Sequence, residues 1–172
     1  IGGTEPHERN LIGNQWFEAI LIETAFNNTV INNYIGVAAD GMTPMPNGWI
    51  DVEQYDYETR ASERRAGIRI SLGSQFNTIG GAGANARNVI VASGNAGIML
   101  SGTETIENEI YNNFIGVGAD GAEHANLGNG FGGVLVENFS SNNNIGADDP
   151  ALGNVISGNK MHGVQLDGEV YS

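Results

Sequence analysis

The chain contains 172 residues, of which 20 are acidic and 7 are basic, so its formal net charge is −13. This acidity excludes the usual nucleic-acid binders, which need a basic face to displace counterions. The absence of cysteine excludes disulfide scaffolds, thiolate metal sites and cysteine nucleophiles. Because 40% of the residues are hydrophobic and only 16% are charged, the composition predicts one folded domain. No apolar stretch reaches the roughly 20 residues that cross a membrane.

Two long segments of the sequence repeat each other. Residues 1–41 and 79–121 both begin with Ile-Gly-Gly, and both end with Asn-Asn, an aromatic residue and Ile-Gly-Val-X-Ala-Asp-Gly. A third, partial copy begins at Ile145. Self-similarity of this kind indicates a stack of structural units.

Each unit contains short segments in which apolar residues alternate with others, and this period predicts strands rather than helices. One set of strands begins with a small residue, in the segments 19–23, 67–71, 97–101, 133–137 and 163–167. Asn-rich strands follow at 28–36, 76–81, 108–116 and 142–146, and several units add a third strand at 9–13, 87–91 or 153–157. Gly, Asn, Asp and Ser between the strands suit the corners.

Three short strands cannot enclose a core alone, so the units are expected to stack as coils, with equivalent residues one above another. Two interior ladders follow from this stacking. They are Ile20, Ile68, Ile98, Val134 and Val164, and Ile22, Ile70, Leu100, Val136 and Leu166. The corner asparagines are interpreted as structural residues, because stacked side-chain amides can hydrogen-bond from coil to coil.

The motifs Ile-Gly-Gly, Ala-Arg-Asn-Val-Ile, Asn-Asn-Phe-Ile-Gly-Val-Gly-Ala-Asp-Gly and Asn-Val-Ile-Ser-Gly-Asn carry a resemblance to a known group. The chain resembles the right-handed parallel β-helix, or pectate-lyase-like fold, and within it the Asn/Gly-rich repeats of bacterial exported and surface proteins. The resemblance implies an all-β, right-handed parallel β-helix of about five coils with three short strands per coil. It also implies export to the cell surface or beyond. Residues 1–172 are then expected to form a single β-helix domain, itself a segment of a longer array.

Residues 42–65 interrupt the repeat as an inserted loop. Its second half has the features of a short helix, with Asp51 as the N-cap. Trp49, Tyr55 and Tyr57 lie among carboxylates in this loop. Such aromatic side chains either stack on a sugar ring or attach the loop to the solenoid wall, and both interpretations remain open. The three residues are therefore candidates for glycan binding.

If the ladders of the first strand set point inward, two more ladders point outward. They are Leu21, Arg69, Met99, Leu135 and Gln165, and Glu23, Ser71, Ser101, Glu137 and Asp167. In pectate-lyase-like enzymes this sheet lines the substrate groove, and the resemblance implies that its acids hold calcium or perform acid–base chemistry.

Glu137 and Asp167 fall on adjacent coils, so their carboxylates are expected within about 5 to 6 Å of each other. A pair at this separation can remain solvated, share a calcium ion or act in catalysis, with Arg69 as a further catalytic candidate.

Leu21, Met99 and Leu135 form an apolar stripe on the outward face. An exposed apolar surface of this kind is usually covered, either by the inserted loop or by another copy of the chain. These three residues are therefore interface candidates.

The sequence favours a structural or adhesive module of an exported or cell-surface protein over an enzyme. Such a module would self-associate end to end or laterally, could also associate with polysaccharide, and would require no cofactor. The alternative is a polysaccharide lyase or hydrolase, with calcium as a cofactor, acting in a groove beside the first sheet. In that case Glu137, Asp167 and Arg69 would carry the chemistry.

Overall fold

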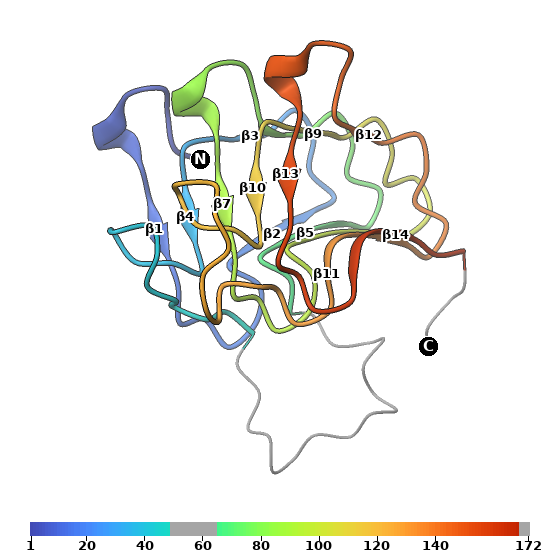
Figure 1. Cartoon of the computed structure of the whole chain (residues 1–172). Helices are drawn as coiled ribbons and strands as arrows, with labels where there is room; N and C mark the ends of the chain where they lie inside the picture. The colour runs from blue at the N-terminus through green and yellow to red at the C-terminus, as the bar shows by residue number, and fades with distance from the viewer. Residues whose placement is uncertain (49–64, 169–172) are drawn as a thin grey trace.

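The computed structural model describes residues 1–48 and 65–168, and it shows a chain wound into successive coils (Figure 1). Three parallel sheets run along the stack, with strand orders β1-β4-β7-β10-β13, β14-β11-β8-β5-β2 and β12-β9-β6-β3. We call them the β1 sheet, the β2 sheet and the β3 sheet. Coil 1 contains β1 to β3, coil 2 β4 to β6, coil 3 β7 to β9, coil 4 β10 to β12, and coil 5 β13 and β14. The predicted parallel β-helix is confirmed.

The strands are short, and the predicted Asn-rich strands 28–36 and 108–116 are each divided into two strands that lie in different sheets. The β1 sheet contains β1 (Leu11–Ile12), β4 (Tyr34–Ile35), β7 (Val89–Ile90), β10 (Phe114–Ile115) and β13 (Val155–Ile156). The β2 sheet contains β2 (Ile20–Glu23), β5 (Ile68–Ser71), β8 (Ile98–Ser101), β11 (Gly132–Glu137) and β14 (His162–Leu166). The β3 sheet contains β3 (Thr29–Val30), β6 (Thr78–Gly80), β9 (Glu109–Tyr111) and β12 (Asn144–Ile145). Within residues 1–48 and 65–168, the 3-10 turns η1 (Pro6–Glu8), η4 (Ala84–Ala86) and η5 (Pro150–Leu152) precede β1, β7 and β13.

The core lies inside the stack and is built from the predicted interior ladders. The register pairs Ile20 with Ile68, Ile68 with Ile98, Ile98 with Val134, and Val134 with Val164. The second ladder follows in the same register, and in coils 1 to 4 both ladders join one buried cluster with residues of the other two sheets. Each fully buried isoleucine is worth about 1.5 to 3 kcal/mol relative to an exposed one.

Asparagine amides connect the coils at the corners, as predicted. One ladder runs through Asn10, Asn33, Asn88, Asn113 and Asn154, and each Nδ2 donates to the Oδ1 of the next residue. A second ladder runs in the same way through Asn28, Asn77, Asn108 and Asn143. Their amides also donate to backbone carbonyls, so these largely buried polar groups have the partners that burial requires.

The two ends of the stack differ in how well they enclose their interior residues. In coil 1, Ile20 and Ile22 are only 6% and 5% exposed, whereas their counterparts in coil 5, Val164 and Leu166, are 45% and 76% exposed. Within the part of the chain that the structure describes, coil 5 contributes no strand to the β3 sheet. Among the described residues, the interior ladders of the β2 sheet are therefore better covered in coil 1 than in coil 5.

Candidate functional site

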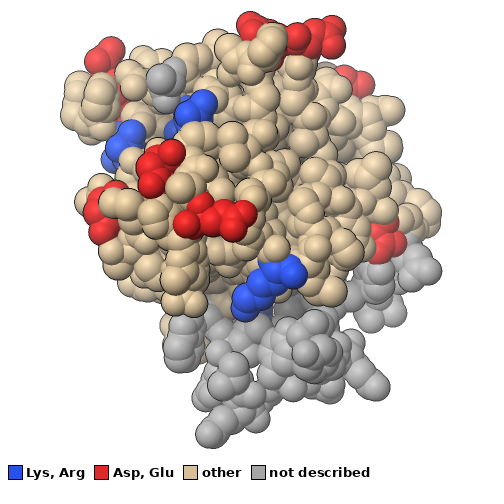
Figure 2. All heavy atoms as spheres, viewed as in Figure 1, with Lys and Arg blue, Asp and Glu red and all other residues tan. Residues whose placement is uncertain are grey.

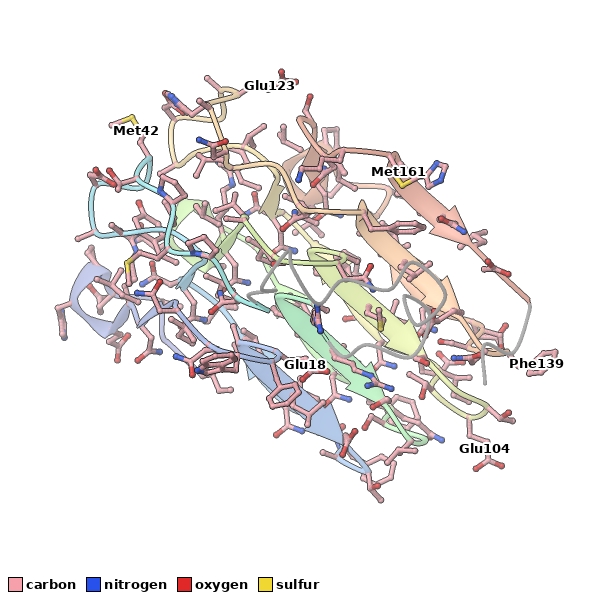
Figure 3. The ribbon with its side chains drawn as sticks, turned by 90° about the horizontal axis from the view of Figure 1, so that it is seen from below. Glu18, Met42, Glu104, Glu123, Phe139 and Met161 are labelled. Atoms are coloured by element: carbon pink, nitrogen blue, oxygen red, sulfur yellow. The ribbon has the colours of Figure 1, made fainter. Side chains whose placement is uncertain are left out.

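The outward face of the β2 sheet carries most of the site residues predicted from the sequence. The register confirms the outward neighbours, because Leu21 pairs with Arg69, Arg69 with Met99, Met99 with Leu135, and Leu135 with Gln165. Figure 3 views the molecule from below, with Glu18 labelled beside β2. This face is the candidate site.

The predicted apolar stripe is only partly exposed. Met99 and Leu135 are buried within the single chain, in a small cluster with Ala66, Ala96 and the partly buried Phe131. This cluster is separate from the interior core. Leu21, in coil 1, is the member of the stripe that remains exposed.

Arg69 forms an ion pair that the sequence analysis did not anticipate. Its Nη1 lies 3.6 Å from Oε1 of Glu18, and the side chains are 15% and 4% exposed, respectively. Glu18 lies just before β2, while Arg69 lies in the next coil, so the pair connects coils 1 and 2. Among the described residues, neither Glu18 Oε1 nor Arg69 Nε has a hydrogen-bond partner. The two charges therefore attract each other in a poorly hydrated environment, where removing one partner destabilises the fold by leaving the other charge buried and unpaired.

Glu137 is a buried carboxylate, only 4% exposed, and not the solvated surface acid that its charge suggests. It accepts hydrogen bonds from Ser101 Oγ at 2.9 Å and from Asn138 Nδ2 at 3.0 Å. Burial raises its pKa above the ordinary value, and the negative charge of Asp167 raises it further. The hydrogen bond from Ser101 and the positive charge of Arg69 lower this pKa but do not cancel the shift.

Asp167 lies on the coil next to Glu137, as predicted. Its backbone N–H donates to the carbonyl of Val136 at 2.7 Å, and its side chain accepts a hydrogen bond from Gln165 Nε2. The ladder repeats its chemistry in coils 1 and 2, where Ser71 Oγ donates to Glu23 Oε1 at 3.2 Å. The ladder thus contains two serine–glutamate pairs, which satisfy carboxylates while they link neighbouring coils.

The predicted calcium ligands Glu137 and Asp167 lie among the described residues, whereas the predicted glycan-binding residues do not. Among residues 1–48 and 65–168, no three His, Asp or Glu side chains gather as a metal site would require. The glycan candidates Trp49, Tyr55 and Tyr57 lie outside the described residues. Residues before them belong to the coil, because Asn47 pairs with Ser93 in a parallel bridge and its buried Oδ1 accepts from the backbone of Gln15.

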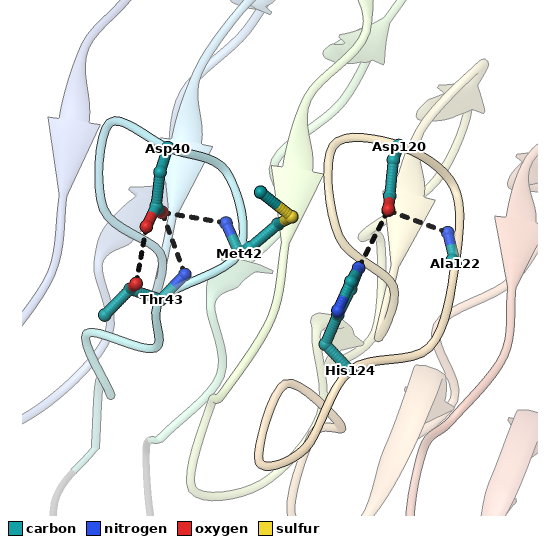
Figure 4. Close-up of polar contacts among 6 residues, drawn as sticks. All are labelled: Asp40, Met42, Thr43, Asp120, Ala122 and His124. Atoms are coloured by element: carbon teal, nitrogen blue, oxygen red, sulfur yellow. Dashed lines mark hydrogen bonds and ion pairs between the residues drawn. The ribbon is translucent and has the colours of Figure 1, made fainter.

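Two equivalent turns each bind the exposed carboxylate of an aspartate (Figure 4). Asp40 accepts hydrogen bonds from Thr43 Oγ1 and from the backbone N–H groups of Met42 and Thr43, and these lower its pKa to about 2. Asp120 accepts from the N–H of Ala122 and lies 2.9 Å from His124 Nε2, and both contacts lower its pKa. The repeated Asp-Gly dipeptide is the sequence signal for these turns.

Acidic side chains are scattered over the face seen in Figure 2, with uncharged surface between them. Among the described residues, no helix has the length and apolarity needed to cross a membrane.

Comparison of the chain with protein-family models, with curated proteins and with solved structures found no match.

Proposed function

We propose that the chain is a structural β-helix module of an exported or cell-surface protein, and that it associates with a second copy through coil 5, where the interior ladders of the described residues are exposed. One observation carries this proposal: Val164 and Leu166 continue the interior ladders but are 45% and 76% exposed. An exposed ladder end with free strand edges is a template for another coil. Covering each side chain would contribute about 1.5 to 3 kcal/mol.

The use of the polar side chains supports a structural role. The corner asparagines are engaged in ladders, Glu137 and Glu23 are paired with serines, and Arg69 is paired with Glu18. Side chains that hold coils together in this way contribute rigidity. The acidic, cysteine-free composition and the resemblance to exported repeat proteins support the surface location.

The test is the assembly state, measured by light scattering after size exclusion, with negative-stain microscopy of the same fractions. Dimers or longer particles are expected, and Leu166→Asp combined with Val164→Asp should convert them to monomers. Leu72→Asp is the matched control, because Leu72 is similarly exposed but lies at a corner of coil 2. A wild-type chain that stays monomeric at all concentrations would contradict the proposal.

A polysaccharide lyase or hydrolase is the second candidate function, and the observation that favours it is the raised pKa of Glu137 beside Asp167. A buried carboxylic acid that keeps its proton can serve as a general acid. The test is turnover on a panel of neutral and acidic polysaccharides, with and without calcium. If a substrate is found, Glu137→Gln and Asp167→Asn should each abolish turnover, and unchanged rates would remove both residues from the mechanism.

A further inference from the structure

One corner of the stack contains bulky side chains in a backbone conformation that suits asparagine or glycine. We call it the ladder corner; it comprises residues 24–28, 72–77, 102–108 and 138–143, which follow the first four strands of the β2 sheet. The residue that precedes each asparagine of the second ladder has a positive φ. These residues are Asn27 at 58°, Phe76 at 57°, Glu107 at 55° and Asn142 at 53°. The backbone therefore has the left-handed conformation at this position in each of coils 1 to 4.

Phe76 has the left-handed conformation although its side chain is too exposed for packing to compensate the strain. A left-handed φ is unfavourable for a bulky residue and well tolerated by asparagine, which the other coils use twice. Leu72 and Phe139 are also left-handed, at φ values of 53° and 65°. Phe76, Leu72 and Phe139 remain 53%, 60% and 58% exposed, so burial does not explain them.

A backbone bridge and hydrogen bonds join the coils that carry the apolar side chains of the ladder corner. The exposed Phe26 of coil 1 forms a bridge with Gln75, the neighbour of Phe76, and Gln75 Nε2 donates to the carbonyl of Glu104 in coil 3. Ser140, next to Phe139, donates to the carbonyl of Thr105. Figure 3 shows Phe139 and Glu104 projecting outward at the same end of the β2 sheet.

The charge of the ladder corner has one sign. Glu104 and Glu107 are exposed there, and its four segments contain no lysine, arginine or histidine. A partner that covers the apolar side chains therefore gains from positive charge. A second copy of the chain is a poor source of that positive charge, because only 7 of its residues are lysine or arginine.

We infer that the ladder corner is a docking surface for a basic, amphipathic segment of another protein. The apolar side chains of Phe76, Leu72 and Phe139 would contact the apolar residues of that segment, and Glu104 and Glu107 would contact its lysines or arginines. The inference goes beyond the proposed coil-end association and does not depend on it, because the surface lies along the side of the stack.

The test uses a fluorescein-labelled synthetic peptide of leucine and lysine, its leucine–glutamate counterpart of equal length, and fluorescence anisotropy. The lysine peptide should bind and the glutamate peptide should not. Phe76→Asn should weaken binding at least fivefold and yet raise the melting temperature by about 2 to 4 °C, because it relieves the strained conformation. Glu104→Gln should weaken binding and reduce its dependence on salt.

Phe17→Asn is the matched control, because Phe17 is an exposed phenylalanine outside the ladder corner, and the variant should bind as the wild type does. The inference is overturned if Phe76→Asn lowers the melting temperature or leaves binding unchanged, or if Phe17→Asn weakens binding equally. Equal binding of both peptides overturns it in favour of unspecific adhesion. Binding of a soluble neutral β-glucan, without binding of the lysine peptide, overturns it in favour of a glycan surface.

Discussion

Residues 1–41 and 79–121 are two copies of one repeat, and they lie in different coils along the stack. In the first copy, the guanidinium of Arg9 donates to Asn32 Oδ1 and lies 4.0 Å from the ring centroid of Tyr34. In the second copy, Arg87 donates to Asn112 Oδ1 and lies 4.0 Å from the ring centroid of Phe114.

In both copies the first residue of the Asn-Asn pair holds the segment before a 3-10 turn in place. Asn32 Nδ2 donates to the carbonyls of Gly3 and Glu5, and Asn112 Nδ2 donates to those of Gly81 and Gly83. The copies differ in burial, because coil 3 has a neighbouring coil on each side while coil 1 has only one within the described stack. The motif thus determines which contacts form, whereas the position in the stack determines how much each contact stabilises the fold.

The largest expected difference between the copies concerns the interior of the β1 sheet. Ile90 is fully buried between β4 and β10, whereas its counterpart Ile12 lies on the edge strand and is only partly buried. Ile90→Ala should lower the free energy of unfolding by about 2 to 5 kcal/mol, because it leaves a cavity that the neighbouring coils cannot fill. Ile12→Ala should cost clearly less. Urea unfolding of both variants measures the difference, and equal losses would contradict the comparison.

The asparagine ladder should show the same contrast on a smaller scale. Asn88 is buried, donates to Val30 and Asn113 and accepts from Asn33, while the exposed Asn10 donates only to Asn33 among the described contacts. Asn88→Ala should cost about 1 to 3 kcal/mol, because buried partners lose their hydrogen bonds. Asn10→Ala should cost less than about 1 kcal/mol, since water replaces the amide. Thermal unfolding of the pair, followed by circular dichroism, would refute the idea if Asn10→Ala proved the more damaging.

The serine–glutamate pairs extend the comparison to pH. Burial raises the pKa of Glu137 above 4.5, so the folded state binds its proton more tightly than the unfolded chain does. The free energy of unfolding therefore falls as pH rises from about 4.5 through the folded-state pKa, and the stabilisation by this proton is present only below that window. Glu137→Gln should flatten this decline and make the protein more stable at pH 7.

Glu23→Gln is the control for this effect, because Glu23 makes the same serine contact but is only partly buried. Unfolding in urea between pH 4 and pH 8 is the measurement. A decline of unchanged slope in Glu137→Gln would show that another group causes it.

The smallest expected effects are on the pKa values of the aspartates in the two Asp-Gly turns, which should change independently of each other. Hydrogen bonds keep the pKa of Asp40 near 2, so its contribution to stability is present above about pH 4 and is lost as pH falls towards 2. Thr43→Val should raise the pKa of Asp40, and His124→Gln should raise that of Asp120, each without affecting the other turn. NMR titration of the side-chain carboxyls measures both values, and a shift in both turns with either variant would mean that they are coupled.

Much of the fold could be predicted from residue spacing. Period-two alternation identifies the strands, and equivalent residues such as Ile68 and Ile98 must stack once the units repeat. The coil-to-coil bonding of Asn33 and Asn88 could be predicted for the same reason. The ion pair between Glu18 and Arg69 could not be predicted in this way. It joins two different positions in neighbouring coils, and neither residue recurs at the equivalent position of another coil.

The repeat, the register of the ladders and the acidic, cysteine-free surface chemistry all follow from residue order and composition. The folded arrangement of the coils settled which outward residues are buried, among them Glu137, Met99 and Leu135. It also decided that Phe76 shares a left-handed position with Asn27 and Asn142. The physical reason is that periodicity specifies which residues face the same side, whereas burial and backbone strain depend on the neighbouring coils.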